Sequence, residues 1–148
     1  MDEQNDIAFD LSADRVFRGM KIAESDDSPR HYLCGVFIEP IEDGGAWIVA
    51  TDGHVMLVQR DRSAAAKETA ILRFQAPRFQ PFEDEDGFIE RDWHWCDSRI
   101  SVPELALSQT VAVPVAHKSR DPWLHVLVER IDGKFPDWRK PLGQSISL

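Results

Sequence analysis

The sequence has little cysteine, no long apolar run and no excess of basic charge, and each absence excludes a class of protein. Its 148 residues include two cysteines, Cys34 and Cys96, which are too few for a disulfide framework. Reduced thiols and a cytoplasmic location are therefore expected. No apolar stretch approaches the roughly 20 residues that cross a bilayer, and the polar, acidic first residues lack the pattern of a signal peptide. We expect no association with a membrane.

The balance of charge is acidic, with a net charge of −9. Binding to nucleic acid depends on Lys and Arg that neutralise phosphates, so it would require a local basic face on an acidic body. The hydrophobic content of 43% and the charged content of 29% are ordinary for a soluble globular protein. The length fits one domain over residues 1–148.

Signatures of catalysis are also sparse. His54 follows Asp52 at a distance that suits a general base oriented by a carboxylate. No Ser or Cys nucleophile has a recognisable motif around it, and no glycine-rich phosphate loop is present. Asp-Gly pairs such as Asp52-Gly53 are far more often turns. We therefore predict no catalytic residue, although a small hydrolase or metal enzyme that uses His54 or His94 remains a further hypothesis.

Two segments suggest metal binding, and neither completes a site. His94 and Cys96 alternate along a predicted strand and would point to the same side, but zinc needs two more ligands. The acidic run Glu83–Asp86 lacks the alternating ligand pattern of a calcium loop. Packing residues and a solvated loop are the simpler interpretations. We predict no metal and no cofactor.

The clearest local pattern lies at the start of the chain. A short strand over Ile7–Leu11 precedes Ser12, which is a candidate N-cap for a helix from Ala13 to about Glu24. At 100° per residue one side of this helix is apolar. The apolar residues are Ala13, Val16, Phe17, Met20 and Ala23, and the opposite side carries Arg15, Arg18 and Lys21 with Asp14 and Ile22 among them. A solvated helix face is the simplest interpretation of these cations, and phosphate binding is the alternative.

The rest of the chain reads as strands joined by turns. Strands are predicted over 32–38, 46–50, 54–58, 69–74, 110–116 and 124–131, with a hairpin over 91–102 and a loop over 60–67. A second helix would fall in Gln75–Glu85, but Pro77 and Pro81 both lie inside that segment and disrupt it. The pattern predicts an α+β fold of about nine strands in two similar halves, each a strand, a helix and three strands, with the second helix degenerate.

Three segments carry a resemblance to a known family. They are Arg30–Val36, with a Tyr-Leu-x-Gly pattern, Val49–His54, with an Asp-Gly turn, and Glu129–Arg139, which contains Asp-Gly-Lys-Phe-Pro-Asp-Trp. Together and in this order they resemble the bacterial replicative sliding clamp, the beta subunit of DNA polymerase III. The similarity covers nearly all of the chain and is greatest to the middle domain of that three-domain protein.

The resemblance implies a non-enzymatic processivity factor of DNA replication. In that family the sheets form the outside of a ring, and helices line a hole through which duplex DNA passes without sequence preference. By this analogy Arg15, Arg18 and Lys21 would contact DNA. Polymerase and other partners dock peptide tails in a groove on the clamp.

Groove positions are carried over onto this chain residue by residue. They fall on Leu33, Thr51, Gly53, His54, Met56, Pro136 and Lys140. The chain departs from the family at Val55, where Arg is usual, and at Pro141, where an aliphatic residue is usual. Both departures suggest an altered peptide specificity.

The family closes its ring with several such domains, whereas this chain resembles one. Closing a ring would therefore require a homo-oligomer, and cyclic assemblies of identical chains close naturally. The alternative is a free-standing clamp-fold module that binds peptide tails and does not encircle DNA.

Overall fold

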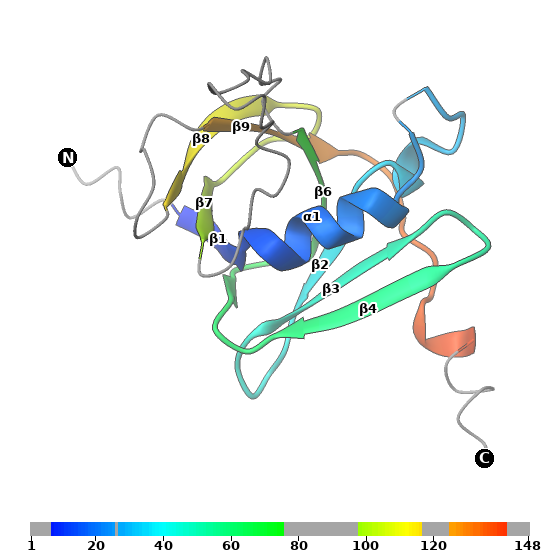
Figure 1. Cartoon of the computed structure of the whole chain (residues 1–148), viewed down its shortest axis with the longest axis horizontal. Coiled ribbons are helices and arrows are strands. Elements are labelled where there is room, and N and C mark those ends of the chain that lie inside the picture. The colour runs from blue at the N-terminus through cyan, green and yellow to red at the C-terminus, as the bar shows by residue number, and fades with distance from the viewer. Residues whose placement is uncertain (1–6, 26, 76–97, 117–124, 142–148) are drawn as a thin grey trace, which may run out of the picture.

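The computed structural model describes residues 7–25, 27–75, 98–116 and 125–141. In this part of the chain nine strands form one antiparallel sheet, and one α-helix, α1, lies across it (Figure 1). The elements are β1 Ile7–Ser12, α1 Ala13–Ile22, a 3-10 turn at His31–Leu33, β2 Val36–Pro40, β3 Ala46–Thr51, β4 Met56–Asp61, β5 Ala65–Ala66, β6 Ala70–Gln75, β7 Arg99–Pro103, β8 Thr110–Ala116 and β9 His125–Ile131. The predicted α+β class, dominated by antiparallel sheet, is confirmed.

The strand order reveals an internal repetition. The sheet runs β4-β3-β2-β6-β9-β8-β7-β1-β5. Strands β2, β3 and β4 form one meander, and β7, β8 and β9 form another. Strand β1 precedes the first meander but pairs with β7 of the second. Strand β6 precedes the second meander but pairs with β2 of the first. The two halves thus exchange their first strands and make equivalent contacts.

The repetition breaks at one place. In the second half β9 pairs with β6 over five residue pairs, from Ile71 with Ile131 to Gln75 with Leu127. The equivalent pairing of β4 with β1 is replaced by the two-residue strand β5, which pairs with β1 at Phe9 and Asp10. Strand β4 is consequently an edge of the described sheet, and it separates from β1.

Helix α1 forms where its sequence predicts and covers one face of the sheet. The Ser12 hydroxyl accepts a hydrogen bond from the Arg15 amide at 3.3 Å, so the predicted N-cap is confirmed. Val16 is fully buried, and Gly19 lets the helix approach β2 closely. A Cβ at Gly19 would lie 2.6 Å from the Val36 side chain. The main core therefore lies between α1 and this face of the sheet.

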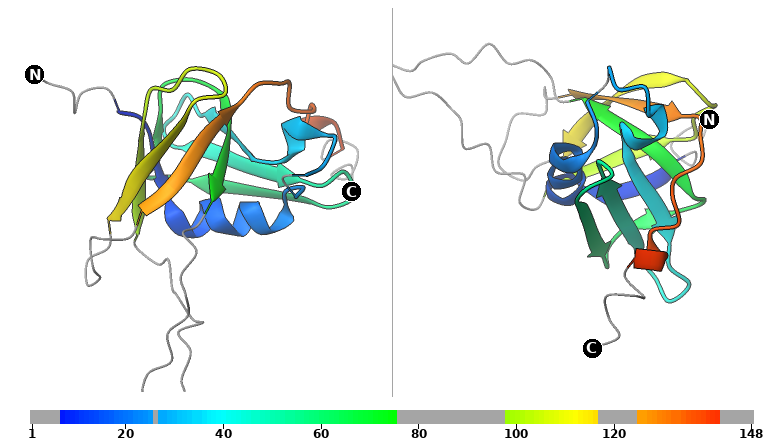
Figure 2. Two further views of the ribbon diagram at one scale, coloured as in Figure 1. Left: turned by 90° about the horizontal axis from the view of Figure 1, so that it is seen from above. Right: turned by 90° about the vertical axis from the view of Figure 1, so that its right-hand side faces the viewer.

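The opposite face of β2 and β3 is covered by the segment 132–141, which follows β9. Alternation along the strands sends Phe37 and Val49 to this side, away from α1. There they join an apolar cluster with Phe135 and Trp138. The right-hand view of Figure 2 shows α1 and this segment on opposite sides of the strands. We call the surface formed here the outer face.

Several predicted boundaries were wrong, and local hydrogen bonds explain two of them. The strand predicted over 32–38 begins only at Val36, because the Leu33 amide donates to the Arg30 carbonyl and 31–33 form a 3-10 turn. The strand predicted over 54–58 begins at Met56, because His54 belongs to a turn. Every strand predicted inside the described ranges nevertheless has a counterpart.

The helix and the loop at 60–67 also differ from the prediction. Helix α1 ends at Ile22, since Ala23 is extended, and Ile22 packs against the core instead of lying among the cations. Within 60–67, β4 continues to Asp61 and β5 adds a short strand. The first residue of the degenerate second helix predicted over 75–85, Gln75, ends strand β6. The rest of that segment, the acidic run 83–86 and the strand that holds His94 and Cys96 lie outside the described residues. Within the described ranges, no helix is long and apolar enough to cross a membrane.

Candidate nucleic-acid interface and peptide groove

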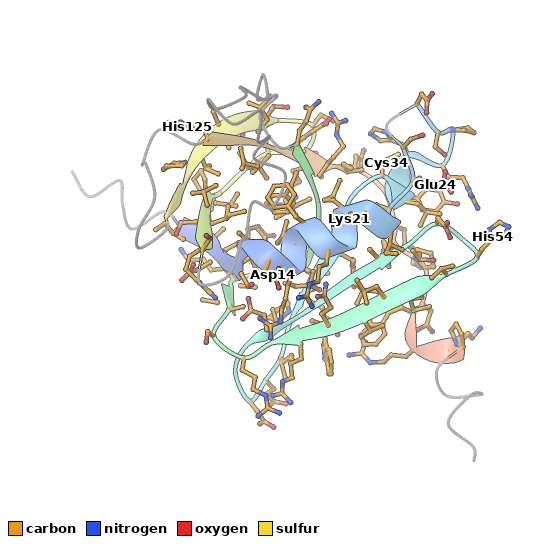
Figure 3. All side chains as sticks on the ribbon, viewed as in Figure 1. Asp14, Lys21, Glu24, Cys34, His54 and His125 are labelled. Atoms are coloured by element: carbon orange, nitrogen blue, oxygen red, sulfur yellow. The ribbon has the colours of Figure 1, made fainter. Side chains whose placement is uncertain are left out.

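The three predicted DNA-binding cations all lie on α1, in different surroundings. Lys21 is exposed in the last turn, where a cation also complements the helix dipole (Figure 3). Arg18 is 64% exposed and lies 3.1 Å from the Asp14 carboxylate. An ion pair this exposed contributes little, so Arg18 remains available to a phosphate. Arg15 is half-buried and lines a cavity beside the start of the helix.

The turn between β3 and β4 carries His54 and is held by its own side chains. The Asp52 carboxylate accepts the main-chain N–H groups of His54 at 2.8 Å and Val55 at 2.9 Å. The Thr51 hydroxyl donates to the Val55 carbonyl at 2.6 Å and accepts the Gly53 amide at 3.0 Å. The carboxylate of Asp52 therefore orders the main chain of this turn, which explains its position before His54 without a catalytic role.

Glycine suits position 53 because of its backbone conformation, and Arg30 packs closely against it. Its φ of +95° is in the left-handed region that favours glycine. A Cβ would also lie 2.5 Å from the guanidinium of Arg30. Arg30 reaches here from the 3-10 turn, donates to the Asp52 carbonyl at 2.9 Å and pairs with Glu24. The family-like segment at 30–36 is thus tied to the turn that carries His54.

The turn responds to pH in a direction set by Asp52. Hydrogen bonds from His54 first and Val55 second lower the pKa of the Asp52 carboxyl. Because the pKa of Asp52 is lowered in the folded protein, its ionised carboxylate stabilises the turn at pH values above the ordinary pKa of a carboxyl group. This stabilisation is lost as pH falls through the lowered pKa of Asp52. We expect the amide resonances of His54 and Val55 to titrate with an apparent pKa below ~3.9. NMR spectra over an acid titration measure this, and a midpoint at or above the ordinary value would contradict the geometry.

The segment after β9 is anchored to the sheet by Glu39 of β2. Its carboxylate accepts the indole N–H of Trp138 at 3.2 Å and the guanidinium of Arg139 at 3.1 Å. The bond from Arg139 lowers the pKa of Glu39 most, and burial opposes that shift. Trp138 also lies against Trp47 with ring centroids 5.6 Å apart, and Phe135 stacks on Phe37 at 4.7 Å. This anchoring fixes Pro136 and Lys140 on the outer face.

Two of the predicted groove residues lie in or against one apolar cluster. Leu33 is buried in it, Met56 packs against it, and Phe135 and Trp138 belong to it. Gly53 and His54 are exposed at the tip of the β3–β4 hairpin (Figure 3). Thr51 supports that tip, and Pro136 and Lys140 are exposed beside their buried neighbours in the chain. Binding of a peptide by these residues stays a prediction.

The two departures from the family pattern, Val55 and Pro141, lie within a few residues of cluster members in the sequence. Val55 is 54% exposed and leaves an apolar side chain next to His54, where a cation would otherwise stand. Pro141 follows Lys140 in the last described turn of the chain. Beside the same cluster a hollow of about 360 Å³ is lined by Phe37, Ile71, Leu107 and Phe135, among others. Nothing in the local sequence patterns predicted this hollow, because its walls come from segments far apart in the chain.

Sequence reasoning also missed Arg60, near the end of β4, and Arg62, directly after it. Both are among the residues that line one cavity with Arg15. The signal was available as an Arg-x-Arg pair, but the pair lay in a segment taken for an ordinary polar loop. In the described portions of the chain, no group of three or more His, Cys, Asp or Glu residues is placed to hold a metal ion. Cys34 is buried and donates its thiol hydrogen to the Ser25 carbonyl.

Comparisons of the chain with models of protein families, with curated proteins and with solved structures found no match.

Proposed function

We propose that the protein is a non-enzymatic, sliding-clamp-like factor of DNA replication in the cytoplasm. It holds duplex DNA through the basic face of α1 and replication partners through the groove on the outer face. The observation that carries the proposal is the exchange of first strands between two equivalent halves. This is the duplication that the clamp resemblance requires.

The two faces of the sheet support the division of labour. Arg15, Arg18 and Lys21 lie on α1, which covers one face of the sheet. Pro136 lies in the segment that covers the other face, and His54 lies in the exposed β3–β4 turn. Sliding requires loose phosphate contacts without base recognition, and long flexible cations on a helix provide them. The net charge of −9 disfavours DNA elsewhere on the surface.

A topological trap tests whether the protein encircles DNA. The full chain would be bound to nicked circular duplex and to the same duplex after linearisation, and both would then be passed through a gel-filtration column in moderate salt. A closed homo-oligomer stays on the circle and slides off the free ends, since its hold is topological. Light scattering on the free protein would report the oligomer. A strict monomer at high concentration, with equal loss from circle and line, would exclude encirclement.

The second candidate is a clamp-fold module that binds peptide tails without encircling DNA. It is favoured by the apolar hollow on the outer face and by the anchoring of Trp138 through Glu39. A fixed apolar surface with an imidazole and a cation at its rim suits a short peptide with Leu or Phe anchors. This candidate survives if the protein proves monomeric.

Replacing His54 with Ala tests the groove directly. We expect a Leu- and Phe-containing peptide to bind about tenfold more weakly to His54→Ala, because the loss of one rim contact costs on the order of 1 kcal/mol. Isothermal titration or fluorescence anisotropy would measure this. Glu42→Ala is the control, since Glu42 is exposed in the β2–β3 turn and belongs neither to the predicted groove nor to the lining of the hollow. Equal affinity of both variants and the unchanged protein would remove His54 from the groove.

A further inference from the structure

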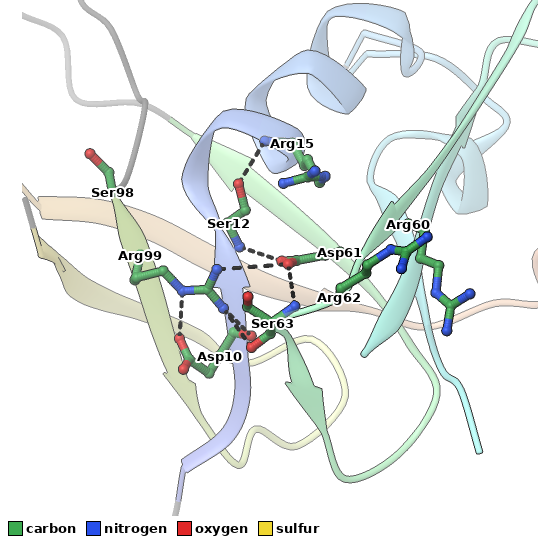
Figure 4. Close-up of a pocket in the computed structure, with 9 residues that line it drawn as sticks. All are labelled: Asp10, Ser12, Arg15, Arg60, Asp61, Arg62, Ser63, Ser98 and Arg99. Atoms are coloured by element: carbon green, nitrogen blue, oxygen red, sulfur yellow. Dashed lines mark hydrogen bonds and ion pairs between the residues drawn. The ribbon is translucent and has the colours of Figure 1, made fainter. Parts of the chain in front are cut away.

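The two sides of β4 face different parts of the molecule, and Arg60 belongs to the side away from α1. Side chains alternate along a strand, so Gln59 and Arg60 point in opposite directions. The Gln59 amide donates to the Arg15 carbonyl of α1 at 2.8 Å, whereas Arg60 lies opposite Trp47 in the β3–β4 pair. In Figure 4 the Arg60 side chain extends away from Arg15 and from the hydrogen bonds around Asp61. The guanidinium of Arg60 therefore belongs to the outer face.

Arg60 ends a row of side chains that begins at the predicted groove. Met56 and Val58 share the side of β4 that carries Arg60, and both pack against the apolar cluster of the outer face. Trp47 also packs against this cluster, and its ring centroid lies 5.8 Å from the guanidinium carbon of Arg60. Trp138 covers Trp47 from the other side of the cluster, with ring centroids 5.6 Å apart. An apolar row thus leads from a groove residue to a cation.

The charge of Arg60 is not neutralised within the described ranges. Most arginines in those ranges pair with a carboxylate, as Arg139 of the outer face does with Glu39 at 2.9 Å. Arg60 makes no ion pair there. Its Nε is also buried without a hydrogen-bond acceptor. Buried donors without acceptors are rare, because the lost hydration is not compensated. Arg60 consequently presents an unpaired charge and an unused donor beside an apolar surface.

We propose that Arg60 binds a carboxylate of the peptide that docks on the outer face. Guanidinium and carboxylate groups form charge-assisted and often bidentate hydrogen bonds, and Nε is one donor of that fork. A carboxylate would supply both the acceptor and the negative charge that Arg60 lacks. The inference rests on the proposed binding of peptide tails and deepens it, since it adds an acidic residue to the Leu and Phe anchors that the groove selects.

The place of Arg60 also predicts where the acidic residue stands in the peptide. Four strand positions separate Met56 from Arg60, which is roughly 13 Å at about 3.3 Å per residue. An extended peptide has the same rise, so its acidic residue should lie about four positions from the apolar residue that contacts Met56. Both directions of the peptide satisfy this spacing.

The test compares two synthetic peptides that differ only in charge. The first has a Leu-Phe anchor flanked on each side by a Glu about four residues away, so that it serves either direction of binding. In the second peptide both Glu residues are Gln. Fluorescence anisotropy would measure the affinity of each peptide for the full chain at low and at high salt.

The protein variants remove one charge each. Arg60→Gln removes the proposed contact, and Arg62→Gln is the matched control. Arg62 is exposed just beyond β4 and makes no ion pair in the described ranges, so its replacement removes the same charge from the same end of the hairpin. Arg60→Lys is the reserve variant, because it keeps the charge but has no fork of donors. Circular dichroism would verify that each variant folds.

The unaltered protein and Arg62→Gln are expected to bind the Glu peptide about tenfold more tightly than the Gln peptide. Arg60→Gln should bind the two peptides equally, and Arg60→Lys should keep only part of the preference. High salt should reduce the preference, since it screens the charges.

Equal affinity of the unaltered protein for the two peptides would overturn this inference and leave the groove standing. A preference that persists unchanged in Arg60→Gln, or in Arg60→Lys should Arg60→Gln fail to fold, would overturn it as well. Absence of binding of both peptides to the unaltered protein would overturn the proposed groove and this inference together.

Discussion

Reversing the charge of Arg15, Arg18 and Lys21 to Glu is expected to weaken duplex binding by about 500-fold at 0.1 M salt. Each phosphate contact contributes about 0.9 to the slope of log affinity against log salt concentration. A slope of about 0.9 means that one contact raises affinity nearly tenfold when salt falls from about 1 M to about 0.1 M. Loss of three contacts should lower the slope by about 2.7 as well. Fluorescence anisotropy with a labelled duplex over a range of salt concentrations measures both quantities.

The reversal should leave the fold largely intact. Glu has nearly the same helix propensity as Arg and Lys, and Arg18 and Lys21 are exposed. A negative charge in the last turn opposes the helix dipole by about 0.3–1 kcal/mol, so a small fall in melting temperature is expected. Circular dichroism would verify the helix, and Lys134→Glu reverses a charge on the outer face as a control. If Lys134→Glu weakens duplex binding as much for each reversed charge as the triple variant does, α1 is not the contact surface.

Replacing Asp61 with Ala is expected to destabilise the protein by about 3 kcal/mol. Asp61 is 1% exposed and lies where β4 leaves the sheet. Its carboxylate accepts the buried Ser12 amide and the Ser63 amide, and it faces the guanidinium of Arg99. Alanine would leave the buried Ser12 N–H without its acceptor, a defect that costs about 1–3 kcal/mol, and would also remove the acceptor of the Ser63 amide and one of the two carboxylates that face Arg99.

Thermal and urea unfolding would measure the effect of Asp61→Ala, which corresponds to roughly 10 °C in melting temperature for a domain of this size. The stability of Asp61→Asn should lie between those of Asp61→Ala and the unaltered protein, because an amide oxygen can accept one of the two N–H groups but carries no charge. Asp43→Ala in the exposed β2–β3 turn is the matched control and should change stability by less than about 0.5 kcal/mol. A loss below 1 kcal/mol at Asp61 would show that it does not hold β4 to β1.

Local signals predicted the elements of this fold well. The N-cap at Ser12 and the apolar stripe of α1 are short-range features, and both formed where they were predicted. The errors came where an apolar run was buried without strand pairing. Tyr32 and Leu33 read as the start of a strand, but a 3-10 turn places Leu33 in the outer cluster instead. Apolar periodicity predicts burial, and it does not predict which hydrogen bonds accompany burial.

The candidate sites divide in the same way. The cations of α1 were visible from helical periodicity alone, because positions three residues apart share a face by geometry. The position of Arg62 was not, because the cavity that it lines with Arg15 is formed by elements far apart in the sequence, and Arg60 instead faces Trp47 across the β3–β4 pair. The outer-face hollow is likewise a product of distant strands, since Phe37 and Phe135 are joined only by the return of the chain after β9.

By itself, the sequence determined the helix with its basic side, the strands, the turns at Asp52-Gly53 and Asp132-Gly133, and the acidic balance of the whole, because each depends on neighbours along the chain. Only the tertiary structure decided that the halves exchange first strands, that β9 pairs with β6 while β4 does not pair with β1, and that residues of α1 and of the end of β4 line one cavity. Those outcomes depend on pairing between residues far apart in sequence, which is set by how side chains pack across the sheet and not by local propensity.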